Sequence, residues 1–215
     1  GETAQAATGR FRDQVREYPE LFTSRRFWGY CGASTFASGA FFAYLGGAPY
    51  VGSEIYHLTP SQVGFYFGAP ALGYFVGNFI AARMSVRLGI NRMILYGSLI
   101  STGGVAIPLV LHFAGFDSAQ LFFGSITLVG LGNGMTMPNG NSGMLSVRPH
   151  LAGSASGVGG AVMLAGGAGL ADLAGTWLAG SETALPLIII MLASSGLSVL
   201  AITYTMRRER FVTGS

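Results

Sequence analysis

The feature that most constrains this chain is a short basic stretch between two long runs without charged residues. The stretch covers residues 82–92 and carries Arg83, Arg87 and Arg92. An arginine at the centre of a membrane helix costs roughly 2.5–3.5 kcal/mol on insertion scales, so the chain must reach water here. Both flanking runs are therefore predicted to span a membrane. Short arginine-rich loops stay on the cytoplasmic side, which fixes the direction of every other span.

The composition leads to the same class of protein. Hydrophobic residues make up 50% of the chain and charged residues 10%, with a mean hydropathy of +0.50. A soluble domain carries about 25% charged residues. Glycine supplies 34 of the 215 residues and falls mainly inside the apolar runs, where small residues let membrane helices approach closely. We therefore predict an all-α protein embedded in a lipid bilayer.

Six membrane-spanning helices account for the distribution of charge. They are predicted at about residues 27–51, 62–82, 93–113, 121–147, 151–173 and 184–206. All arginine clusters then fall on one side, and Glu54, Asp117 and Glu182 fall on the other. An odd number of spans would leave a basic cluster outside, so both ends are expected in the cytoplasm. The predicted segments are a cytoplasmic linker at 1–26, a six-helix transmembrane domain at 27–210 and a cytoplasmic tail at 211–215.

The N-terminal segment leaves two interpretations open. The chain begins without a Met or a signal-peptide pattern, so we expect it to begin in the middle of a longer protein. Phe11, Val15, Tyr18 and Phe22 recur at helical spacing. Such a face suits a helix that lies along the membrane surface, whereas Pro19 suits a solvated linker.

A helix break is predicted near the outer end of the first span. Gly46 and Gly47 are flexible, and Pro49 lacks an amide hydrogen, so the helix is expected to kink or open there. Thr59 and Pro60 then signal a new helix, with Thr59 as the N-cap and Pro60 in the first turn.

Two spans carry side chains suited to a substrate-binding cavity. Asn133 and Asn141 recur on one face of the fourth span, and amide side chains are costly against lipid, so this face should look at protein or water. Ser38, Phe41 and Tyr44 lie on roughly one face of the first span. They mix polar and aromatic groups of the kind that hold an apolar or cationic ligand. Ordinary helix packing explains the same aromatic stripe, and both interpretations stay open.

Asp172 is the candidate for proton coupling. It is the acid expected inside the membrane, near the outer end of the fifth span. An acid in that place can exchange a proton as its surroundings alternate between wet and dry. The alternative is that Asp172 only caps the span at the level of the lipid headgroups.

Other kinds of chemistry lack the residues they need. His57, His112 and His150 lie on different predicted loops or span ends, so no metal site with recognisable ligand spacing is expected. No nucleophile is accompanied by a base in a known pattern, and we expect neither an enzyme nor a bound cofactor. The arginine clusters lie beside span ends without interleaved aromatic residues, which excludes nucleic acid as the expected partner.

Several segments occur in an order typical of one transporter family. They are residues 41–51, 58–64, the basic stretch up to Arg92, 137–139 and 152–156. Their order resembles helices seven, eight, ten and eleven of the Bcr/CflA drug-resistance branch of the major facilitator superfamily. The resemblance covers nearly the whole chain from about Arg26 onward.

The basic stretch is similar to the cytoplasmic-loop signature of the superfamily. The resemblance thus assigns Arg83, Arg87, Gly89 and Arg92 to a loop that takes part in conformational change. The acidic member of that signature is missing here, and Met163 stands where many relatives carry glutamine.

The resemblance implies the C-terminal six-helix half of a twelve-helix transporter. Spans one to three and four to six would be inverted repeats, with the binding site near the midplane between the two halves. The implied activity is proton-coupled multidrug efflux of small hydrophobic or cationic compounds, which confers antibiotic resistance. It implies protons, the bilayer, a small-molecule substrate and a missing N-terminal half as partners, the proton gradient as energy source, and the bacterial inner membrane as location.

Two other functions remain open. The same fold serves an exporter of metabolites such as sugars, amino acids or nucleosides, and charged groups in the missing half would favour that cargo. A six-span scaffold that transports nothing is the third possibility. An upstream reading frame with six further spans would eliminate it.

Overall fold

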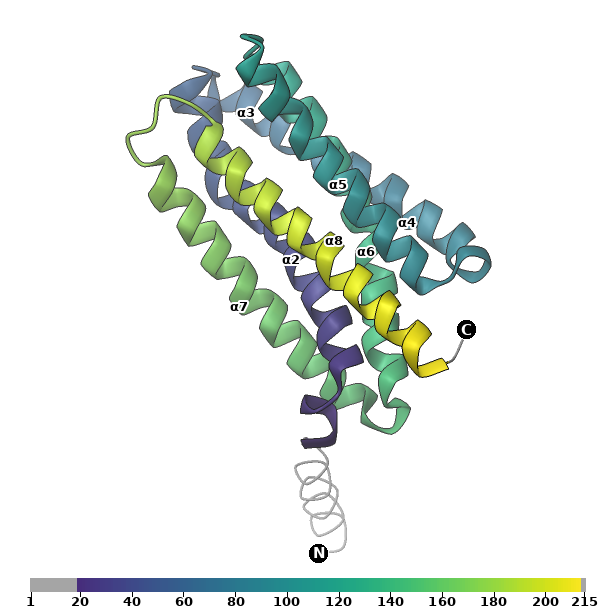
Figure 1. Ribbon diagram of the computed structural model, residues 1–215. Coiled ribbons are helices and arrows are strands. Elements are labelled where there is room, and N and C mark those ends of the chain that lie inside the picture. Colours follow the sequence, from purple (N-terminus) through teal and green to yellow (C-terminus); the bar gives the residue numbers. More distant parts are fainter. Residues whose placement is uncertain (1–18, 214–215) are drawn as a thin grey trace, which may run out of the picture.

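The computed structural model describes residues 19–213 as a bundle of helices (Figure 1). Its elements are α2 (Arg25–Tyr50), the π-helix η1 (Val51–Ile55), α3 (Pro60–Phe67), α4 (Ala69–Leu88), α5 (Ile90–Phe113), α6 (Ala119–Val147), the 3-10 helix η2 (Pro149–Leu151), α7 (Ala152–Leu178) and α8 (Leu185–Thr213). Residues 19–22 are also helical. Most of the predicted linker, including Phe11, Val15 and Tyr18, lies outside the described residues.

The fold is that of an all-α membrane protein with six transmembrane helices. Within residues 19–213, four helical stretches are long and apolar enough to cross a membrane: α3 with α4, α5, η2 with α7, and α8. The other two, α2 and α6, have 26 and 29 residues, which also suffices to cross. They are less apolar because they pack against several other helices and turn much of their surface to protein instead of lipid.

Two intertwined repeats of three helices make up the bundle. The first contains α2, α4 with its short partner α3, and α5, and the second contains α6, α7 and α8. Both α4 and α5 pack on α6, just as α7 and α8 pack on α2. In addition α2 packs on α6, and α5 packs on α8. Each of these contacts thus has a counterpart in which the corresponding helices of the two repeats are exchanged, as expected for inverted repeats.

Backbone contact between α4 and α6 depends on glycine at four positions. On α4 these are Gly73 and Gly77, and on α6 they are Gly130 and Gly134. A Cβ atom on Gly130 would overlap the carbonyl oxygen of Pro70. A Cβ atom on any of the other three glycines would likewise overlap a backbone carbonyl oxygen of the facing helix. In lipid, helices associate through such van der Waals packing. The crossing is therefore closed to larger side chains.

The second predicted span consists of two helices. Gly68 lies between α3 and α4, and its carbonyl oxygen accepts a hydrogen bond from the amide of Ala71 at 3.0 Å. Pro70 has no amide hydrogen with which to continue the helix ladder, which explains the break. The start of α3 follows the sequence prediction. The amide of Gln62 donates to Thr59 Oγ1 at 3.4 Å, and the amide of Thr59 donates to Gln62 Oε1 at 2.9 Å.

The sequence predicts a kink or an opening at Gly46, Gly47 and Pro49, and the helix does not open there. The helix α2 stays intact through Pro49 and then changes into the π-helix η1. Proline removes one hydrogen bond of the ladder, and the change of hydrogen-bond pattern follows two residues later, so the irregularity is a bulge and not a break. Gly46 serves packing instead, because a Cβ atom there would lie 2.5 Å from the carbonyl oxygen of Ala171 on α7.

The basic stretch 82–92 is helical apart from one residue, so the predicted loop is a single turn at Gly89. This residue has a φ of +83° and separates α4 from α5. Arg83, Arg87 and Arg92 are exposed, and the Arg83 guanidinium lies 4.7 Å from the centre of the Phe79 ring. Arginine reaches water by extending its side chain along the helix, so the helix need not end where the apolar run ends.

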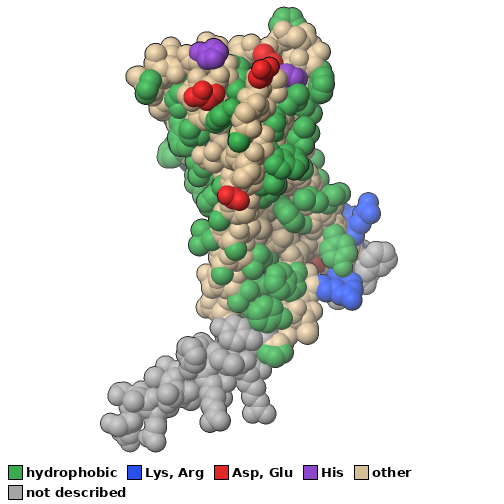
Figure 2. All heavy atoms as spheres, turned by 90° about the vertical axis from the view of Figure 1, so that its left-hand side faces the viewer, with side chains coloured by type: hydrophobic (Ala, Val, Ile, Leu, Met, Phe, Trp, Pro, Cys, Tyr) green, Lys and Arg blue, Asp and Glu red, His purple; other side chains and the backbone are tan. Residues whose placement is uncertain are grey.

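Most charged groups lie near the two ends of the bundle. Figure 2 shows most acidic and histidine side chains of that face near one end and arginines near the other. At the acidic end, His112 Nδ1 lies 2.6 Å from Asp117 Oδ2 and joins the end of α5 to the following turn. Burial, with a smaller contribution from Asp117, raises the pKa of Tyr56 to about 12, so this outer tyrosine stays neutral.

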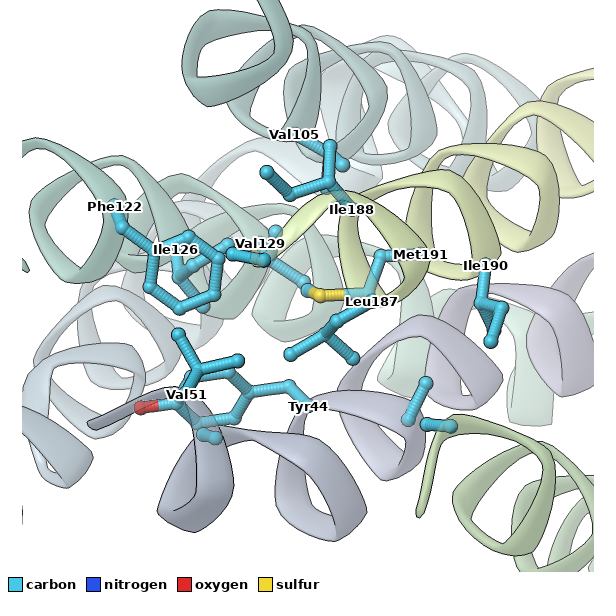
Figure 3. Packing of buried hydrophobic residues seen from close by; sticks show 14 of the residues in the cluster. Tyr44, Val51, Val105, Phe122, Ile126, Val129, Leu187, Ile188, Ile190 and Met191 are labelled. Atoms are coloured by element: carbon cyan, nitrogen blue, oxygen red, sulfur yellow. The ribbon is translucent and has the colours of Figure 1, made fainter. Parts of the chain in front are cut away.

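The largest hydrophobic cluster lies between α2, α6 and α8 (Figure 3). Tyr44 and Val51 meet Ile126 from α6 and Leu187 and Ile188 from α8, all five with no more than 1% of their surface exposed. This cluster ties the first and last helices of the described chain to the centre of the bundle.

The glycine contacts between α4 and α6 predict a position-specific effect on stability. Gly130→Ala should lower the melting temperature by roughly 2–12 °C, because overpacking costs about 1–3 kcal/mol. Gly124→Ala on the same helix is the matched control, since a Cβ atom there meets nothing within 4 Å. It should be neutral or slightly stabilising. Thermal unfolding in detergent measures both variants, and equal melting temperatures would contradict the close contact.

Candidate functional site

A pocket of about 440 Å³ lies between α2, α4, α6 and α7, the first two helices of each repeat. Its lining residues come in groups of neighbours from each helix: Ser38, Phe41 and Phe42; Pro70, Ala71 and Tyr74; Gly130, Asn133 and Met137; Gly160, Met163 and Leu164. Ser38 and Asn133 stand near the midpoints of α2 and α6. The pocket therefore lies at mid-depth in the bundle, where the two repeats meet.

The wall of the pocket is almost wholly apolar. Aromatic rings come from Phe41, Phe42 and Tyr74, and flexible thioethers come from Met137 and Met163. Methionine adapts to ligands of different shape, and the faces of aromatic rings attract cations. Among residues 19–213, no charged side chain lines this pocket. The site suits an uncharged or singly cationic molecule with a large apolar surface.

Asn133 supplies the main polar feature of the pocket. Only 4% of its surface is exposed, and its Oδ1 atom has no hydrogen-bond partner among the described residues. Leaving a buried acceptor unpaired costs about 1–3 kcal/mol. Ser38 uses its hydroxyl hydrogen to donate to the carbonyl oxygen of Thr35 at 3.1 Å, so this side chain also offers an acceptor. Ser38 and Asn133 thus bring acceptor oxygens to the lining of the pocket, although Asn133 Oδ1 itself is covered by neighbouring atoms.

The structure brings together three of the five predicted substrate-binding residues. Ser38, Phe41 and Asn133 line the pocket, whereas Tyr44 and Asn141 do not. Asn141 is exposed on α6 about two turns after Asn133. Asn141 therefore lies on the surface of the bundle, outside the pocket.

Tyr44 belongs to an aromatic cluster behind the pocket. It is fully buried, and its ring stacks on Phe41 and Phe67 with centroid distances of 6.2 Å and 5.5 Å. Phe123 of α6 packs edge-on against it at 6.3 Å. Figure 3 shows Tyr44 beside Val51 within the core. Tyr44 thus supports the ring of Phe41, which in turn faces the pocket.

Asp172 lies outside the pocket. It is exposed on α7, about two turns beyond Leu164 and more than one turn before the helix ends at Leu178. Its carboxylate is therefore placed within the length of a spanning helix, on a surface that the rest of the described chain leaves open.

Sequence patterns did not single out the contribution of α4 to the pocket. Pro70, Ala71 and Tyr74 follow the break at Gly68. The spacing of Gly68 and Pro70 is a helix-break signal that was available in the sequence. Leu164 had no such signal, because it is one apolar residue among many on α7.

Comparison with known proteins decides the family. Residues 2–171 match the family model described as Major Facilitator Superfamily. The chain belongs to the major facilitator superfamily. It is similar to "Uncharacterized MFS-type transporter YdgK" of Bacillus subtilis (strain 168), with 26% identity over 196 residues. The match covers 91% of this chain and 48% of that protein, so the chain spans about half the length of the curated relative it matches.

Membership of this superfamily gives the bundle a function class. The chain is a multi-pass membrane protein, and the superfamily points to membrane transport rather than to an enzyme. The arrangement of the six helices is consistent with the C-terminal half of the superfamily fold. The pocket lies at mid-depth in the bundle, the depth at which transporters built from inverted repeats bind their substrates.

The unpaired oxygen of Asn133 predicts an unusual mutational result. Asn133→Leu should keep or raise the melting temperature, because it removes a buried acceptor that has no partner. Asn139→Leu is the matched control on the same helix, since Asn139 is also buried but donates to the carbonyl oxygen of Met135 at 2.8 Å. The control should lose roughly 2–4 °C. Thermal unfolding in detergent compares the two, and a larger loss for Asn133→Leu would mean that its oxygen is paired.

Proposed function

We propose that the chain is the C-terminal six-helix half of a twelve-helix alternating-access antiporter. Its role is to export small hydrophobic or cationic compounds across the bacterial cytoplasmic membrane in exchange for protons. The observation that carries this proposal is the apolar, aromatic pocket whose lining includes Asn133, a residue with an unpaired buried oxygen.

The chemistry of the pocket favours this cargo over a metabolite. Sugars and amino acids need several hydrogen bonds or ion pairs to offset the loss of water. Within residues 19–213 the polar side chains of the lining are those of Ser38, Tyr74 and Asn133, and none of the lining side chains is charged. A hydrophobic amine, by contrast, buries its apolar body against Phe41, Phe42 and the methionines and donates its N–H to Asn133.

The order of segments supports the position of this chain in a longer transporter. The residues from Phe41 to Val51, the new helix at Thr59 and the basic turn around Gly89 follow the order of the Bcr/CflA branch. The chain also matches about half the length of its Bacillus subtilis relative. In the proposed transporter, the second half covers the open side of the pocket, and the two halves rock about it.

Asp172 is the proposed site of proton coupling in this half. Among residues 19–213, it is the acid that lies along a spanning helix and not at a helix end or in a turn. It stands on α7, which also lines the pocket through Met163 and Leu164. Movement of α7 between the two access states would change the hydration of the carboxylate and with it the proton affinity.

Export from cells tests the proposed function. The parent gene, expressed in a bacterial strain without its own efflux pumps, should raise survival on hydrophobic cationic antibiotics and lower retention of a cationic dye. A protonophore should remove both effects, because proton return drives export. Unchanged survival and dye retention, with the protein confirmed in the membrane, would contradict drug export and favour a metabolite exporter.

A charge-neutral variant tests the coupling role in the same assay. Asp172→Asn should abolish proton-driven dye export while the protein stays folded in the membrane, because the amide cannot bind and release a proton. Glu182→Gln removes an exposed acid from the loop before α8 and should leave export unchanged. Full activity of Asp172→Asn would overturn the assignment of this residue and leave the drug cargo intact.

A further inference from the structure

A second pocket lies at the arginine-rich end of the bundle, where α2 begins and α8 ends (Figure 1). Its volume is about 580 Å³. Four segments that are distant in the sequence form it: the start of α2, the start of α5, the end of α6 with the residue that follows, and the end of α8. Neither the proposed cargo pocket nor the transport cycle described above uses this site.

The lining of this second pocket is strongly basic. Among the described residues, five arginines and one glutamate line it: Arg25, Arg26, Arg148, Arg208, Arg210 and Glu209. No other charged residue in the described chain borders the cavity. An excess of positive charge in a concave site attracts anions.

The glutamate cancels only one of the five positive charges, and its carboxylate is already bound by neighbouring side chains. Glu209 Oε1 accepts hydrogen bonds from Arg26 Nε at 2.8 Å and from the Tyr30 hydroxyl at 3.0 Å. Its Oε2 accepts from the side-chain amide of Asn91. The network joins α2, α5 and α8 and holds the cavity in shape.

The remaining arginines differ in their partners. Arg148 pairs with Glu20, with 2.6 Å between Nε and Oε1. Arg25, Arg208 and Arg210 form no salt bridge within residues 19–213. They line one cavity at close quarters, where like charges repel. A bound anion would relieve that repulsion.

The backbone adds to the preference for an anion. The helix α2 begins at Arg25, after Ser24 as N-cap. The Phe27 amide donates to Ser24 Oγ at 3.4 Å, whereas the first two amides of a helix have no acceptor within it, and a helix N-terminus carries the positive end of the helix dipole. Val147 and Met206 border the cavity on its apolar side. The pocket therefore combines apolar and charged side chains, as is typical of the place where a spanning helix meets the lipid headgroups.

We propose that this pocket binds a phosphate-bearing anion. Planar guanidinium groups bind phosphate oxygens in pairs, which makes arginine well suited to phosphate recognition. Basic pockets between membrane helices bind phosphorylated lipid headgroups. The phosphate comes either from the headgroup of an anionic phospholipid or from a soluble phosphate compound, and the experiment below separates these sources.

The test measures the thermal unfolding of the purified protein in phosphatidylcholine nanodiscs. One arm adds phosphatidylglycerol to the bilayer, and the other titrates inorganic phosphate at constant ionic strength. The variant Arg25→Gln/Arg208→Gln removes two charges from the pocket. The matched control Arg83→Gln/Arg207→Gln removes two exposed arginines that do not line it, one of them next to Arg208 on α8.

At least one of the two probes should raise the melting temperature of the natural protein in a saturable way. Its apparent affinity should fall about tenfold or more in the pocket variant and change less than about twofold in the control. A response to phosphatidylglycerol alone identifies a lipid headgroup, and a response to inorganic phosphate identifies a soluble ligand as able to bind. Absence of stabilisation by either probe, or equal losses in both variants, would overturn the site. If the pocket variant fails to fold, Arg210→Gln carries the same test.

Discussion

Contact between the backbones of helices from different repeats is the interaction on which the rest of this structure depends. Within a bilayer the hydrophobic effect does not draw helices together, so association relies on close packing. Gly77 faces the carbonyl oxygen of Leu131, and Gly134 faces that of Tyr74. These contacts hold α4 against α6. The candidate cargo pocket borders the same crossing, because Gly130 contributes to both.

The sequence predicted the six helices well, because hydrophobic run length and arginine position are strong physical constraints. The start of α3 at Thr59 was equally clear from its capping pattern. Side-chain direction around a helix was harder to predict. At about 100° per residue, Asn141 points about 80° away from Asn133, and Tyr44 points about 120° away from Ser38. Each of these angular differences around the helix axis is large enough to direct a side chain away from the pocket.

The two pockets could not be predicted from the sequence, because each is formed by segments that only the folded chain brings together. The break before Pro70 brings α4 into the pocket, and the cavity at the basic end joins segments as distant as Arg25, Arg148 and Arg208. Arginine clusters first indicated topology alone. In the folded chain they also form a concave basic site, so one set of charges orients the protein in the membrane and is proposed to bind phosphate at its surface.

Protection of a single cysteine by cargo tests the central claim that the pocket between the repeats binds the exported compound. Cys31 is the one cysteine of the chain, so Met163→Cys in a Cys31→Ala background gives one reactive thiol in the pocket. Val86→Cys, at a position 93% exposed outside the pocket, is the control. The account predicts that a cationic aromatic dye slows thiol modification at position 163 and not at 86. Equal rates with and without dye at both positions, in protein that exports the dye, would contradict it.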